Sequence, residues 1–199
     1  ADKQFQAEGK NSAAVLDKLA KVEDVAAANA VDIADAFRTG GNSLAEFSKS
    51  IDDSIGLIAA LREQTRKSGS EIGTFLKTIQ TRIFAAGEAR DAVEGLGIAI
   101  ENLDGSLRPT KDVLNDLKTA FDGMTESQAA SAAKAIAGVR QFESLIATLN
   151  SIDRANELAR ESAAAAGAAE EKRTITDAKL ERQLGKLVAA GETLAEALG

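Results

Sequence analysis

Few residue types in this chain could carry out chemistry. The sequence has no cysteine and no histidine, which removes disulfides, thiolate nucleophiles, histidine–metal sites and every Ser–His or Cys–His pair. Carboxylates are the remaining candidates for metal binding or proton transfer. Asp52 and Asp53 are adjacent in a helical pattern, and adjacent helical residues point in different directions. They are poorly placed to share one ion, so we interpret them as part of a solvated face.

A second acidic group surrounds a predicted turn. Glu101, Asp104 and Asp112 lie near Gly105, but their spacing is not that of a calcium-binding loop. The Gly95-Leu96-Gly97 run is not a nucleotide-binding loop either, because neither G-x-G-x-x-G nor G-K-[ST] follows it. The sequence contains no pattern typical of a tuned acid–base pair. We therefore expect no enzyme activity, no metal and no cofactor.

Composition limits the remaining classes. The 199 residues carry a net charge of −7, which argues against a nucleic-acid-binding surface, since such a surface needs clustered Lys and Arg. The apolar fraction is 44%, yet the chain has no Trp, no Tyr and seven Phe. A core built mainly from small side chains predicts a slim bundle of modest stability. No apolar run approaches the roughly 20 residues of a membrane span.

The hydrophobic spacing predicts an all-α protein, a slim multi-helix bundle. We expect a frayed N-terminus over residues 1–10, a helical core over 11–151, and a long C-terminal helical segment over 152–199 that is possibly kinked near Gly167. One short stretch differs, because alternating apolar residues and an Asp-Gly pair predict a small β-hairpin at about 98–108. We interpret the chain as a piece of a longer protein.

Capping residues predict where two helices in the first half of the chain begin. The Ser43-Leu44-Ala45-Glu46 run fits a capping box and predicts one helix that continues to about residue 66. After it, Ser70 is the predicted N-cap of a helix that ends near Phe84. Gly73 lies inside that helix, where a glycine costs roughly 1 kcal/mol relative to alanine. The missing Cβ predicts a close approach by a neighbouring helix.

A leucine pattern near the C-terminus predicts a helix interface. The leucines, with Gly191 among them, step alternately by three and four residues, which is an a/d heptad seam. This seam could pack on the same chain or against another copy, and the spacing does not distinguish the two. The candidate interface residues are Leu180, Leu184, Leu187, Leu194 and Leu198.

Four segments resemble one known family. SEIGTFLKTIQTRIF, from Ser70 to Phe84, resembles the S-x-x-G-T-x-L-K-T-I segment of phage tail tape measure proteins. LDGSLRPTKDVLNDL (103–117) and AGVRQ (137–141) resemble two further segments of the same conserved core, in the same order, and AGAAEE (166–171) resembles its end. The resemblance covers nearly the whole chain. The motif residues to which it gives a structural role are Ser70, Gly73, Leu76, Lys77, Arg82, Gly105, Pro109, Gly138 and Arg140.

The resemblance implies a structural function rather than a reaction. Tape measure proteins lie in the lumen of the growing tail tube, fix its length and leave ahead of the DNA at infection. The implied partners are the tail tube protein, tail assembly chaperones and other copies of the chain, with no nucleic-acid partner. The implied location is the virion tail lumen, after the host cytoplasm during assembly, with membrane contact only at ejection. The alternatives are a helical adaptor without a virion role and, third, a membrane-active amphipathic segment.

Overall fold

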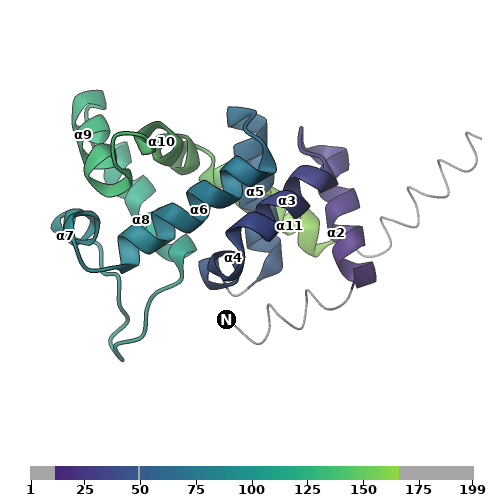
Figure 1. Cartoon of the computed structure of the whole chain (residues 1–199), viewed down its shortest axis with the longest axis horizontal. Helices are drawn as coiled ribbons and strands as arrows, with labels where there is room; N and C mark the ends of the chain where they lie inside the picture. The colour runs from purple at the N-terminus through teal and green to yellow at the C-terminus, as the bar shows by residue number, and fades with distance from the viewer. Residues whose placement is uncertain (1–11, 49, 166–199) are drawn as a thin grey trace, which may run out of the picture.

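The computed structural model describes residues 12–48 and 50–165, and within them the fold is all-α, as predicted (Figure 1). The helices follow one another with short connections, apart from the longer loop between α7 and α8. They are α2 (Ser12–Val25), α3 (Ala30–Gly40), α4 (Asn42–Phe47), α5 (Ile51–Thr65), α6 (Gly69–Phe84), α7 (Glu88–Gly95), α8 (Thr110–Asp122), α9 (Glu126–Ala137), α10 (Phe142–Asn150) and α11 (Ile152–Ala163).

Helix α5 is the centre of the bundle. Its residues from Ile51 to Leu61 are buried, with the exception of Asp53. A helix that is apolar on nearly every side must be covered on every side, and α2, α3, α4, α6, α10 and α11 all contact it. Small residues let these neighbours come close. A Cβ placed on Gly56 would lie 2.7 Å from the backbone nitrogen of Ala159 in α11.

Helices α2 and α11 lie side by side and antiparallel against α5. Lys21, in the middle of α2, pairs with Glu161 near the end of α11 at 3.3 Å. Arg154, near the start of α11, donates to the carbonyl oxygen of Val25 at the end of α2 at 2.7 Å. The beginning of α2 therefore lies beside the end of α11, as Figure 1 also shows.

Helix α6 connects the two parts of the molecule. It contacts α3, α4 and α5 on one side, and α7 and α9 on the other, so in Figure 1 it runs across the body of the protein. Its buried face includes Ile72, Phe75, Leu76 and Ile79. One contiguous core results, and it includes residues from α2 through α11.

Two predicted helix starts are wrong. The helix expected from Ser43 to about residue 66 is two helices, and its first part begins at Asn42 with Gly41 as the N-cap. That first helix, α4, ends at Phe47. The second, α5, begins at Ile51, and Ser50 caps it by accepting a hydrogen bond from the Asp52 N–H. The N-cap of α6 is Ser68 rather than Ser70. Ser68 forms a reciprocal capping box with Glu71, which lies three residues later as the motif requires.

The hairpin expected at about 98–108 is reduced to one antiparallel bridge, between Glu101 and Leu107. The loop is nevertheless well defined. The Asn102 N–H donates to the Ser106 carbonyl at 2.8 Å, and the Gly105 N–H donates to the Asn102 carbonyl at 3.0 Å. Gly105 has a φ of 79°, the left-handed geometry that ends a three-residue hairpin turn.

The prediction for residues 152–199 can be compared with the structure only as far as residue 165. The segment 152–199 was expected to be a long helix beyond the core, but its first part, α11, lies in the core and buries Ile152, Ala155 and Leu158. The expected kink near Gly167, the leucine seam and the frayed residues 1–10 all lie outside the described residues.

Candidate functional site

The motif around Gly73 forms a close crossing between α3 and α6. A Cβ on Gly73 would lie 3.0 Å from the Gly40 nitrogen and closer still to the Ala36 carbonyl oxygen. One turn earlier, a Cβ on Gly69 would lie 2.7 Å from the carbonyl carbon of Asp32. The close helix approach that Gly73 predicts is thus present, and Gly69 extends it. The Gly69-x-x-x-Gly73 spacing, visible in the sequence, puts both residues on one face of α6.

The other residues of this motif divide between core and solvent. Leu76 is buried in the core, whereas Ser70 and Lys77 are exposed. The Ser70 hydroxyl accepts a long hydrogen bond, 3.4 Å, from the Thr39 hydroxyl. These three residues do not converge on one point, so the motif specifies a packing face of α6 and not a binding pocket.

Arg82 and Gly138 meet at the end of α9. Arg82 Nε donates to the Ile136 carbonyl at 2.9 Å, and Arg82 Nη2 donates to the Ala135 carbonyl at 3.4 Å. Gly138, with a φ of 81°, caps the helix through its N–H to the Lys134 carbonyl at 2.9 Å. The last carbonyls of a helix lack partners within it, and a cation is favoured there. Arg82 therefore joins α6 to α9.

Arg140 differs from the expectation. The resemblance gives it a structural role, but it is exposed in the turn before α10. Within residues 12–48 and 50–165 its side chain has no hydrogen bond and no ion pair.

Gly105 and Pro109 shape the loop between α7 and α8. Pro109 is the N-cap of α8, and its carbonyl accepts from the Asp112 N–H at 3.0 Å. Asp104 accepts from both the N–H and the hydroxyl of Ser106, and these bonds lower the pKa of Asp104. Glu101 pairs with Arg90 at 2.8 Å. Two of the three carboxylates in this acidic group, Glu101 and Asp104, are thus held by local partners.

Asp52 and Asp53 are not on a solvated face, which corrects their sequence-based interpretation. Asp52 is buried, and both of its carboxylate oxygens accept from Lys18 of α2, at 2.6 and 2.7 Å. Its Oδ1 also accepts from the Ser162 hydroxyl of α11 at 2.5 Å. Asp53 pairs with Lys111 of α8 at 2.5 Å. One Asp pair at the start of α5 therefore joins three other helices.

A second charged junction holds the other end of the α2–α11 pair. Arg154 of α11 binds both oxygens of Glu63 in α5, at 3.0 and 3.1 Å. The Arg154 hydrogen bond lowers the pKa of Glu63, burial opposes the shift, and the Ala27 N–H adds to the lowering. The hydrogen bonds that Arg154 donates to Glu63 and Glu157 raise the pKa of Arg154.

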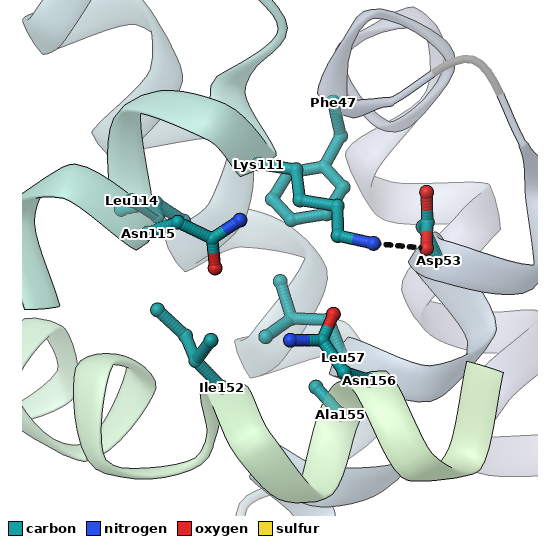
Figure 2. A pocket seen from close by; sticks show the side chains of 9 residues that line it. All are labelled: Phe47, Asp53, Leu57, Lys111, Leu114, Asn115, Ile152, Ala155 and Asn156. Atoms are coloured by element: carbon teal, nitrogen blue, oxygen red, sulfur yellow. Dashed lines mark hydrogen bonds and ion pairs between the residues drawn. The ribbon is translucent and has the colours of Figure 1, made fainter. Parts of the chain in front are cut away.

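A small hollow lies where α4, α5, α8 and α11 meet (Figure 2). Its cavity volume is about 20 Å³, room for about one water molecule. Apolar side chains form its floor, and the Asp53–Lys111 ion pair crosses one side. Asn115 and Asn156 also line it. The polar residues of the hollow do not form a set of acid, base and nucleophile.

The described residues carry no recognisable ion site. Within 12–48 and 50–165, no three His, Cys, Asp or Glu side chains come together in a way that could hold a metal ion. Over the same residues, no helix combines the length and apolar character needed to cross a membrane.

Six of the nine motif residues thus serve helix packing (Gly73, Leu76), helix ends (Arg82, Pro109, Gly138) or a turn (Gly105), as in a structural helical domain. The sequence model of one family, described as phage-related minor tail protein, matches residues 1–138. Because this match covers more than half of the chain, the chain belongs to the phage-related minor tail proteins, and so is associated with the phage tail. The match ends at Gly138, so Arg140 and the segment 152–199 lie beyond it. No solved structure matches the chain.

Proposed function

We propose that this chain is a segment of a tail tape measure protein, which lies in the tail lumen, sets the length of the tail tube and is released at genome ejection. One observation carries the proposal. Within the family match, four residues of the tape measure resemblance lie at the contacts that define the fold: Gly73 at a helix crossing, Arg82 and Gly138 at a helix end, and Gly105 in a turn. Such positions suit structural work.

Physical properties of the chain support the same function. An α-helix advances about 1.5 Å per residue, so a chain that extends as one continuous helix would convert residue number into length. The net charge of −7 disfavours adhesion to DNA that passes through the same tube. A core that lacks Trp and Tyr also has little of the large buried aromatic area that stabilises other domains.

The proposed partners follow from the proposed location. In the tail lumen the chain would contact the tail tube protein and other copies of itself, and during assembly in the host cytoplasm it would contact tail assembly chaperones. Membrane contact belongs to ejection alone, and no nucleic acid or cofactor is part of the proposal.

Tail length provides the test. Deleting residues 166–199 in frame from the gene of the parent phage removes 34 residues of the expected C-terminal helix. At about 1.5 Å per residue, tails should shorten by about 50 Å, measured by electron microscopy of purified virions. As the matched control, an unrelated helical sequence of equal length at the same place should restore the original length.

Two results would refute the proposal. Tails of unchanged length after the deletion would assign the chain to the alternative class, a helical adaptor. Flotation of the purified chain with liposomes, in the absence of other tail proteins, would instead favour the membrane-active segment.

A further inference from the structure

The bend between α2 and α3 contains no helix breaker. Its sequence is Ala26-Ala27-Ala28-Asn29, and alanine is the best helix former. Neither Gly nor Pro occurs between residues 12 and 39. Apolar side chains continue through the bend at steps of three and four, the spacing of a single helix face. They are Val15, Leu19, Val22, Ala26, Ala30, Ile33 and Phe37. The local sequence therefore favours one continuous helix from α2 into α3.

Contacts with other helices impose the bend. Glu63 of α5 accepts from the Ala27 N–H at 3.1 Å, and Arg154 of α11 donates to the Val25 carbonyl at 2.7 Å. In a continuous helix both backbone groups would instead bond within the helix. The Asn29 side chain accepts from a backbone N–H in the first turn of α3 at 2.7 Å and caps that helix. These contacts hold residues 26–29, the hinge, in the bent form.

Helix α2 is attached to the bundle by a narrow face. Its fully buried apolar residues are Leu19, Ala20 and Val22. Two ion pairs add to this face: Lys18 with Asp52 of α5 at 2.6 Å, and Lys21 with Glu161 of α11 at 3.3 Å. A helix with so few large buried side chains opens at a lower free-energy cost than the whole domain. Both carboxylates lie outside α2, so the α2 of another copy can make the same pairs.

We propose that α2 exchanges between two copies of the chain. In the exchanged form, α2 continues α3 as one helix through the hinge and packs on α5 and α11 of the second copy. The occupant is a second copy because that surface already fits α2 in the closed form. The exchange is reciprocal, so each copy regains the contacts that it gives up and the assembly closes as a dimer. The proposal does not depend on the tape measure function.

The two forms differ at the hinge, so hinge substitutions should shift the monomer–dimer equilibrium in opposite directions. Ala27→Gly keeps the N–H that Glu63 binds but disfavours the helical hinge about fivefold. A dimer has two hinges, so the association constant should fall about 25-fold. Asn29→Ala removes a cap that exists only in the closed form and should raise it about 25-fold. Ala34→Gly is the matched control, because Ala34 is exposed and helical in both forms.

Sedimentation equilibrium of the full chain measures these constants, and Ala34→Gly should leave the constant within about twofold of the parent value. Far-UV circular dichroism of each variant checks that the helices are intact.

The absence of cysteine from the chain permits a direct test of the exchange. One preparation carries Lys21→Cys on α2, and a second, with a different tag, carries Glu161→Cys on α11. The two are mixed in urea, refolded together and treated with a short bismaleimide. They should give an interchain product, because these two side chains meet in the fold. In the control, Val139→Cys replaces Lys21→Cys, since Val139 is 75% exposed but lies in the turn after α9.

Three results would overturn the proposal. The first is a chain that stays monomeric at every concentration both with and without Asn29→Ala. The second is an interchain product from Lys21→Cys no greater than that from Val139→Cys. The third is a dimer that Ala27→Gly and Ala34→Gly weaken equally, which would assign the association to another surface, such as the leucine seam.

Discussion

Replacing Gly73 by alanine should destabilise the domain, although alanine is the better helix former. In an open helix the change would stabilise by about 1 kcal/mol. Here the new Cβ would lie 3.0 Å from the Gly40 nitrogen and closer to the Ala36 carbonyl oxygen. Both are backbone atoms, so no side-chain rotation can relieve the overlap, and α3 must move away from α6. Overpacking usually costs about 1–3 kcal/mol, and this rigid contact belongs at or above the upper end.

The net loss should therefore be about 2 kcal/mol, equivalent to a fall in Tm of about 4–8 °C for a chain of this size. Thermal and urea unfolding followed by far-UV circular dichroism measure it. Gly95→Ala is the matched control, because a Cβ on Gly95 meets nothing within 4 Å, and it should be neutral or stabilising by up to about 1 kcal/mol. A Gly73→Ala variant as stable as Gly95→Ala would refute the reasoning. Adding Ala36→Gly should not rescue Gly73→Ala, since the overlap is with the backbone.

Three further changes test the other junctions by urea unfolding. Arg82→Met removes the cation from the end of α9 and should cost about 1 kcal/mol, whereas Arg140→Met, at an exposed position, should stay within about 0.5 kcal/mol; equal effects would contradict the capping role. Asp52→Asn should cost about 2–3 kcal/mol, because it leaves a partly buried lysine without its charge partner, and an unchanged midpoint would argue against the junction. The folded pKa of Glu63 lies below its ordinary value of 4.5, so its contribution is complete above that pH and is lost as the pH falls through the folded pKa. The unfolding free energy should drop over this range, and less steeply in Glu63→Gln; identical slopes would exclude the effect.

Local contacts were largely predictable from the sequence. The glycine inside α6 indicated a close neighbour because the cost of a mid-helix glycine needs a compensating contact. The misplaced N-cap had a visible signal: Ser68 and Glu71 have the capping-box spacing, whereas Ser70 lies one residue before the glutamate. The start of α5 also had a signal: Ser50 can act as an N-cap, and after Ile51 come two aspartates, which are favoured in the first turn of a helix.

Contacts between distant elements were not predictable. Nothing near Asp52 in the sequence distinguishes it from a solvated aspartate, because its partners Lys18 and Ser162 come from the first and last described helices. The contact of Arg82 with the end of α9 was not predictable either, because it depends on α6 and α9 lying side by side in the fold. The sequence indicates which face of each helix is apolar. Which of these faces pack against each other depends on the crossing angles between helices, and those angles are set by the whole bundle.

The antiparallel arrangement of α2 and α11 has a mechanical consequence. The described chain enters the bundle at residue 12 and leaves it at residue 165 on the same side, so the folded bundle adds almost nothing to the span of a thread that runs through it. As one continuous helix the same stretch would extend about 230 Å at about 1.5 Å per residue. Tension on the two ends would peel α2 from α11 one junction at a time, beginning at Lys18 and Ser162. A few polar contacts thus keep folded a stretch of chain that could extend much further.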